Sequence, residues 1–113
     1  PVLGARELTT SPSTAASAAA ATNGDASSIE LAEIYAPFSH QQLILTEAIG
    51  LSDSTKINPS GGALAANPMF SAGLERIGFA ARHVFAGEAS RVLAHATSGP
   101  ALQQNLVAVL EGR

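Results

Sequence analysis

The sequence predicts an α/β fold in which a mixed sheet is covered by helices and ends in an antiparallel pair of strands. Three observations support this prediction. Helical and strand patterns alternate along the chain, residues 70–86 repeat apolar side chains at helical spacing, and the last two strand patterns are separated by a turn at Ser98-Gly99-Pro100. The length of 113 residues and the 46% hydrophobic content suit one domain.

The first element is expected to be a helix. Ser11 can cap it, and Pro12 suits its first position because proline lacks an N–H that would need a partner inside the helix. The alanine-rich run that follows has high helix propensity and reaches about Ala21, where Asn23-Gly24 supplies a left-handed stop. A linker of small residues is the alternative interpretation of this segment.

A strand and a second helix follow. Residues 29–35 lie between turn-forming residues and predict a strand. Ser39 and Gln42 have the spacing of a capping box, which predicts a helix from His40 to about residue 49. Gly50-Leu51 then has the pattern of a Schellman-type helix end.

The longest helix is expected over residues 70–86. Two glycines inside it, Gly73 and Gly78, each cost about 1 kcal/mol relative to alanine, so we expect close packing against another element. The helix should therefore be among the most buried elements. Its apolar stripe consists of Phe70, Leu74, Ile77, Gly78, Ala81, Val84 and Phe85. Residues 91–97 and 105–110 predict the two final strands.

Composition excludes several classes of function. The formal net charge is −3 and no basic run is present, which disfavours nucleic acid and membrane surfaces as partners. The absence of cysteine excludes disulfides, thiolate metal sites and a thiol nucleophile within this chain. His40 and His83 share no metal-ligand spacing, so we expect no metal and no cofactor. No apolar run is long enough to span a bilayer and no signal peptide pattern is present, which favours the cytoplasm.

The most informative motif is residues 57–68, Ile-Asn-Pro-Ser-Gly-Gly-Ala-Leu-Ala-Ala-Asn-Pro. It resembles the Asn-x-x-Gly-Gly-x-x-x-Gly-His-Pro segment of the thiolase superfamily. Asn58, Gly61 and Gly62 match that segment, and the resemblance implies that they shape a substrate-binding loop. Asn67 stands where the family has a catalytic histidine.

Two further stretches extend the resemblance, so that it covers most of the chain from about residue 11 to 110. Residues 33–38, Glu-Ile-Tyr-Ala-Pro-Phe, are similar to the Glu-x-Asn-Glu-Ala-Phe segment or its histidine-containing version, with Tyr35 at the Asn or His position. Residues 96–99, Ala-Thr-Ser-Gly, lie near the family's second Cys-x-Gly motif. Thr97 takes the place of the acid/base cysteine, or Ser98 does if the alignment shifts by one residue, and Gly99 stands at the glycine.

The resemblance implies an acyl-CoA-handling protein of lipid metabolism, similar to acetyl-CoA acetyltransferases and lipid-transfer-type thiolases. Residues 1–113 would form the C-terminal region of such a protein, without the N-terminal half and the first strand of the domain, and Pro1 as the first residue agrees with this. The expected partners are acyl-CoA, the remaining N-terminal half, and further subunits in a homo- or hetero-oligomer. A CoA thioester would be a substrate or ligand, not a cofactor.

Three functions remain open at the level of the sequence. Thiolysis needs an imidazole and a second thiol, which Asn67 and Thr97 do not supply, so acyl-CoA handling without strong thiolytic activity comes first. A lyase that cleaves a CoA thioester by retro-aldol chemistry is the second, with Tyr35 as acid/base and backbone donors near Asn67 and Gly99 as an oxyanion site. A non-catalytic scaffold subunit is the third. His95 is a further catalytic candidate, whereas Glu33 is interpreted as structural.

Overall fold

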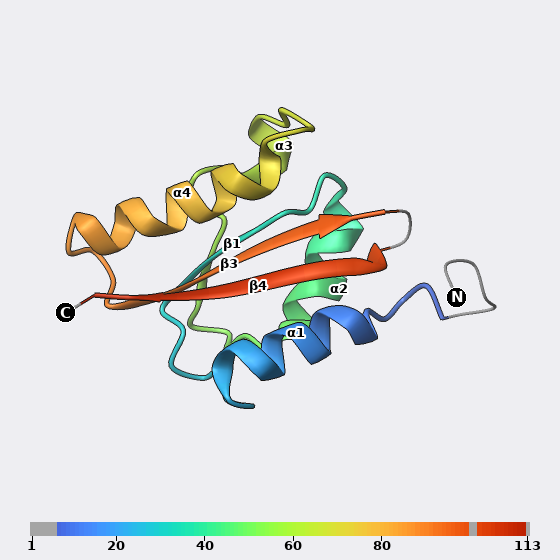
Figure 1. Ribbon diagram of the computed structural model, residues 1–113, viewed down its shortest axis with the longest axis horizontal. Coiled ribbons are helices and arrows are strands. Elements are labelled where there is room, and N and C mark those ends of the chain that lie inside the picture. Colours follow the sequence, from blue (N-terminus) through green and yellow to red (C-terminus); the bar gives the residue numbers. More distant parts are fainter. Residues whose placement is uncertain (1–6, 100–101, 113) are drawn as a thin grey trace.

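The computed structural model describes residues 7–99 and 102–112 (Figure 1). Four strands form one mixed sheet in the order β2-β1-β3-β4. Strand β1 (Leu31–Ile34) pairs in parallel with β2 (Lys56–Ile57) and with β3 (Arg91–Ser98), while β3 pairs antiparallel with β4 (Gln104–Glu111). The α/β class and the final antiparallel pair are therefore as predicted from the sequence. Pro100, expected in the turn between β3 and β4, lies outside the described residues.

Helices cover both faces of the sheet. Helices α1 (Pro12–Thr22) and α2 (Ser39–Ile49) lie on one face, and α4 (Ala72–Phe85) crosses the other (Figure 1). A short helix, α3 (Gly62–Ala65), precedes α4. Neither α3 nor the two-residue strand β2 was predicted, because elements of this length have no measurable periodicity.

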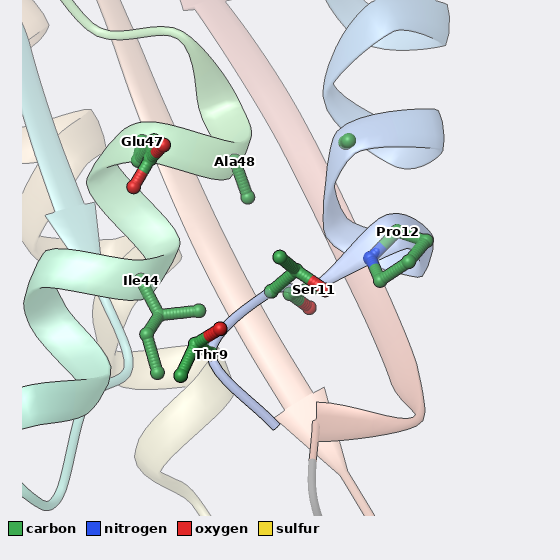
Figure 2. Close-up of a pocket in the computed structure, with 8 residues that line it drawn as sticks. Thr9, Ser11, Pro12, Ile44, Glu47 and Ala48 are labelled. Atoms are coloured by element: carbon green, nitrogen blue, oxygen red, sulfur yellow. The ribbon is translucent and has the colours of Figure 1, made fainter. Parts of the chain in front are cut away.

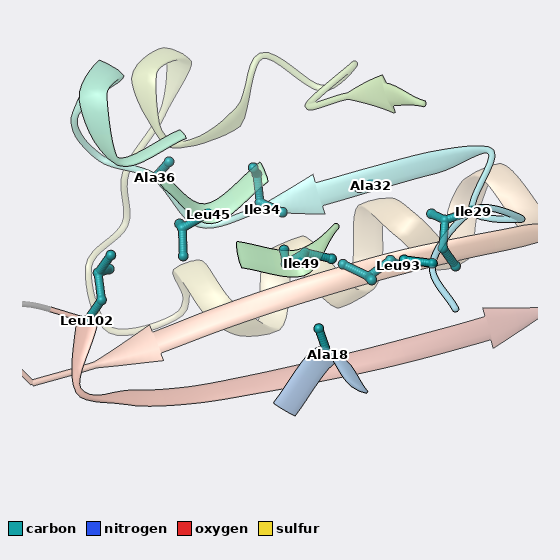
Figure 3. Close-up of a cluster of buried hydrophobic side chains, with 10 residues drawn as sticks. Ala18, Ile29, Ala32, Ile34, Ala36, Leu45, Ile49, Leu93 and Leu102 are labelled. Carbon is teal, nitrogen blue, oxygen red and sulfur yellow. The ribbon is translucent and has the colours of Figure 1, made fainter. Parts of the chain in front are cut away.

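The larger core lies between the sheet and the α1/α2 layer. Ile34 and Leu93 from the sheet pack with Leu45 and Ile49 from α2, and Ala18 of α1 closes the cluster (Figure 3). Because Ala18 has almost no side chain, α1 can approach the sheet closely. The core is thus built of small and aliphatic residues, as the composition suggests.

The two helices on this face differ in how well their ends were predicted. Ser11 and Pro12 begin α1 at the expected residues, but the Ser11 hydroxyl bonds to the hydroxyl of Thr14 and caps no backbone N–H. Asn23 ends the helix with φ at 53°. The capping box of α2 is wrong: Ser39 is already inside the helix, Phe38 is the N-cap, and no side chain caps the first turn. Its C-terminal end matches the prediction, because the Gly50 N–H bonds to Glu47 O and the Leu51 N–H to Thr46 O in the Schellman pattern.

Helix α4 forms as predicted but turns a different face to the sheet. Its buried residues are Ala72, Arg76 and Ala80, whereas Leu74 is 73% exposed. A Cβ atom added at Gly73 would lie 2.7 Å from the Cβ of Ala96, so the helix sits too close to the sheet for larger side chains. Ala72, Gly73 and Ala80 therefore lie toward the sheet, whereas Leu74 and Phe85 face outward and Ile77 and Val84 are half-buried against the core. Gly78 is exposed, so the close packing expected there is not found.

Candidate functional site

The candidate site lies where the parallel strands β1 and β3 end. Tyr35 follows β1 directly, and its N–H bonds to the carbonyl of His95 at 3.3 Å, which keeps it beside β3. At this end a hollow of about 410 Å³ opens to the surface. It is lined by residues from both strand ends, α2 and the loop before α4, namely Tyr35, Pro37, Phe38, Gln41, Met69, Thr97, Ser98, Gly99 and Leu102.

Two candidates that are 32 residues apart meet at the rim of this hollow. The Tyr35 hydroxyl donates a hydrogen bond to Asn67 Oδ1 at 3.1 Å. Asn67 is exposed and Tyr35 is half-buried, so this pair is open to solvent. The amide nitrogen of Asn67 has no hydrogen bond with the described residues and can therefore donate to a ligand.

The turn after β3 contributes hydroxyl groups and a glycine. Thr97 is half-buried and donates a hydrogen bond from Oγ1 to the carbonyl of Gln104 at 3.0 Å. Ser98 is exposed, and Gly99 has φ at 76°, in the left-handed region that favours glycine. The structure thus brings Tyr35, Thr97, Ser98 and Gly99 to one hollow, with Asn67 at its rim.

Asn58 lies near the site but is engaged in holding the fold together. Its Oδ1 accepts the N–H of Ile34 at 2.7 Å, and its Nδ2 donates to Gln42 Oε1 at 3.1 Å. The side chain therefore prolongs the pairing of β1 at the point where β2 ends. A Cβ added at Gly62 would lie 2.9 Å from the Asn58 amide, and both Gly61 and Gly62 have positive φ. These three residues shape the loop that leads to Asn67.

Beneath the loop lies a buried ionic cluster. Glu33 is 0% exposed, and its carboxylate accepts hydrogen bonds from the N–H and the hydroxyl of Ser60 at 3.0 and 2.7 Å. Arg76 of α4 is 1% exposed and its Nη1 lies 3.4 Å from Glu33 Oε2. The cluster joins β1, the loop and α4, which agrees with a structural role for Glu33. The sequence prediction missed Arg76 and Ser60. The only signal in the sequence for this cluster was that Arg76 is a charged residue on the helix with the strongest apolar stripe.

His95 is fully buried and does not line the hollow. Its Nε2 lies 2.9 Å from Asn105 Oδ1, so Nε2 bears the proton in the neutral ring, while Nδ1 has no partner among the described residues. Asn105 in turn donates to Ser13 of α1 and to the carbonyl of Leu102. Burial lowers the pKa of His95 below its ordinary value of 6.5, although the hydrogen bond to Asn105 opposes the shift.

The buried histidine predicts a pH-dependent stability. The unfolded chain takes up a proton on this ring near pH 6.5, while the folded protein resists protonation until a lower pH. The contribution of His95 to the free energy of unfolding is therefore complete above pH 6.5 and declines as the pH falls below 6.5. Urea unfolding at pH 7.5, 6.5 and 5.5 measures the decline. We expect His95→Gln to flatten it and His40→Gln, at an exposed position, to leave it in place. An unchanged decline in His95→Gln would contradict the assignment.

A second hollow lies between the N-terminal end of α1 and helix α2 (Figure 2). Its volume is about 290 Å³ and it is lined in part by Thr9, Ser11, Ile44, Glu47 and Ala48. Glu47 is the ionisable side chain of this lining, and none of the candidates from the sequence lies here. A substitution in this second hollow can therefore serve as a control for ligand binding at the hollow beside Tyr35.

No protein-family model matches the chain, and neither a curated protein nor a solved structure shows detectable similarity to it. Within residues 7–99 and 102–112, no cluster of three or more His, Asp or Glu side chains is arranged to hold a metal ion. None of the helices in this part of the chain has the length and apolar character needed to cross a membrane.

Proposed function

We propose that the protein binds acyl-CoA thioesters at the hollow beside Tyr35, as a thiolase-like protein of lipid metabolism with little thiolytic activity. The observation that supports this most is the hydrogen bond between Tyr35 and Asn67. Both positions are marked by the resemblance to thiolases, from motifs far apart in the chain. In this proposal the chain acts in the cytoplasm as the C-terminal region of a larger acyltransferase-like protein, with its N-terminal half as a partner.

The hollow has the size and lining for an acyl thioester. Ligand pockets commonly measure about 300–1,000 Å³, and this one holds about 410 Å³. Phe38 and Met69, both exposed, offer apolar surface for the acyl chain. The Asn67 amide can donate a hydrogen bond to the thioester carbonyl, and the backbone N–H of Gly99 is a second candidate donor.

The chemistry of the lining argues against thiolysis. An amide at Asn67 cannot accept a proton as an imidazole does, and the Thr97 hydroxyl already donates to a backbone carbonyl and is far from titrating near pH 7. The chain contains no cysteine to take the acyl group. Loss of general acid/base assistance typically lowers a rate about 100- to 10,000-fold.

Ligand binding tests the proposal, and the chain offers a specific reporter. Tyr35 is its single tyrosine, so a sample labelled with ¹³C-tyrosine gives ring signals from this site alone. We expect acetoacetyl-CoA to shift these signals. Asn67→Ala should weaken binding about fivefold through the loss of one hydrogen bond, and Glu47→Gln, in the second hollow, should leave it unchanged. No shift at millimolar acetoacetyl-CoA would overturn the proposal.

A second candidate function is retro-aldol cleavage of a β-hydroxyacyl-CoA. The observation that favours it over a scaffold is that Tyr35 lines the hollow with its hydroxyl at the rim. In one balanced step the Cα–Cβ bond breaks, Tyr35 receives the proton of the β-hydroxyl and gives its own proton to the α-carbon. From a substrate whose β-carbon is tertiary, a ketone and a shortened acyl-CoA result, and the phenol is regenerated.

A further inference from the structure

The outer face of α4 is an apolar surface that the chain itself does not cover. We define this face by four residues, Leu74, Gly78, Ala81 and Phe85. Leu74 is 73% and Phe85 is 87% exposed. Phe70, two residues before the helix begins, is 100% exposed. Two large exposed apolar side chains on one helix, with a third just before it, exceed the scattered exposure that is ordinary for a protein surface.

The spacing of these residues is that of a helix-pairing seam. Steps of four, three and four along the helix place Leu74, Gly78, Ala81 and Phe85 in one row, as in the a and d positions of a coiled coil. A Cβ added at Gly78 would meet nothing within 4 Å, so no contact in the structure requires glycine there. Glycine inside a helix nevertheless costs about 1 kcal/mol relative to alanine. Close approach of a second helix would explain it.

The charges beside the seam indicate which helix this is. Glu75 and Arg82 are seven residues apart and both occupy the e position of the heptad, whereas Ile77 and Val84 occupy the g position. In an antiparallel pair of two identical helices, e positions face e positions. Glu75 of each copy, which lies 3.7 Å from Arg76 Nη2 in its own chain, would then gain Arg82 of the other copy as a second partner. The apolar g residues pack partly on the core of their own chain, and their exposed parts would face one another. In a parallel pair the charges would face apolar residues instead.

We propose that two copies of this chain associate through α4, antiparallel and about a twofold axis. Leu74 of one copy packs against Phe85 of the other, and Gly78 packs against Ala81 at the centre, where small side chains let the helices approach. Arg82 is free to take part, since it forms no ion pair with the described residues and only lies over the Phe79 ring at 5.8 Å. This inference does not depend on the proposed acyl-CoA binding.

Charge reversal tests both the partner and the orientation. Glu75→Arg alone and Arg82→Glu alone each replace two attractions across the interface by two repulsions, and we expect each to raise the dimer dissociation constant roughly tenfold. Because Glu75→Arg also removes the contact with Arg76 inside the chain, thermal unfolding of this variant is measured beside its association. The double variant should restore wild-type association. Mixing the two single variants should give a heterodimer tighter than either homodimer, because arginines of one chain would then face glutamates of the other. Sedimentation velocity on the whole chain measures all four samples.

Gly78→Leu provides an independent check. A Cβ at this exposed position would meet nothing within 4 Å, so far-UV circular dichroism and thermal unfolding should show a folded protein, while dimerisation is lost. A wild-type protein that stays monomeric at 100 micromolar would overturn the proposal. So would a dimer that tolerates Gly78→Leu, or one that the charge reversals do not affect, since another surface would then hold the two copies together.

Discussion

Replacing Arg76 by Met is expected to lower the free energy of unfolding by about 3–5 kcal/mol, because the substitution leaves the Glu33 carboxylate buried without its cation. Glu33 and Arg76 are 0% and 1% exposed, so solvent screens this pair very little. The two hydrogen bonds from Ser60 would remain but do not neutralise the charge. Urea denaturation at pH 7 measures the loss.

A second arginine–glutamate pair serves as the matched control. Arg91 lies 3.0 Å from Glu111, and the Glu111 side chain is 64% exposed. Exposed pairs contribute about 0–1 kcal/mol, so Arg91→Met should cost much less than Arg76→Met. Combining Arg76→Met with Glu33→Gln should recover part of the loss, since the uncompensated charge is then removed. Equal losses for Arg76→Met and Arg91→Met would contradict the assigned role of the buried pair.

The fold was largely predictable because its strongest signals are local. Ser11-Pro12 and Asn23-Gly24 delimit α1 through backbone preferences that need no tertiary partner. The start of α2 was not predictable in the same way. Gln42, expected to complete the capping box, instead accepts a hydrogen bond from Asn58 in a loop 16 residues away. A contact of this kind depends on how the sheet places the loop.

The orientation of α4 shows a second limit of sequence reasoning. The apolar stripe predicted that Leu74, Ile77 and Ala81 would be buried, yet Leu74 is exposed and the other two are half-buried. Two features of the folded state turn the helix: Arg76 is drawn inward by Glu33, and Ala72 and Gly73 permit close contact with β3. Hydrophobic periodicity predicted the helix but not which of its faces meets the sheet.

The candidate residues were selected from the sequence by their chemistry, and only the structure shows how they are arranged. Tyr35 and Asn67 were selected from separate motifs, and the structure joins them by a hydrogen bond. Asn58 was selected for substrate binding, but both ends of its side-chain amide are engaged with Ile34 and Gln42. His95, selected for its position near Thr97, is fully buried and its ring bonds to Asn105 of β4. Burial of this kind depends on tertiary packing, which short motifs do not encode.

The largest expected effect on activity concerns Tyr35→Phe. If the protein cleaves a β-hydroxyacyl-CoA, removal of this hydroxyl should lower kcat about 100- to 10,000-fold, because the step then has no group to accept the β-hydroxyl proton and to protonate the α-carbon. Binding should change little, since the ring keeps its place in the lining of the hollow. The measurement follows release of the ketone and the shortened acyl-CoA from a β-hydroxyacyl-CoA, beside thiolysis of acetoacetyl-CoA as a second assay.

Two variants separate the roles of the pair at the rim. Asn67→Asp retains an oxygen that can accept the Tyr35 hydrogen bond but removes the amide donor, so it should impair substrate binding more than proton transfer. Ser98→Ala, in the same hollow, should have a small effect on either quantity because Ser98 is exposed at its edge. Cleavage that survives in Tyr35→Phe would exclude Tyr35 as the acid/base. We expect thiolysis to be negligible. A thiolysis rate of about 10 per second, a typical enzyme turnover, would contradict this expectation and show that the hydroxyl and amide groups of the site suffice for the reaction.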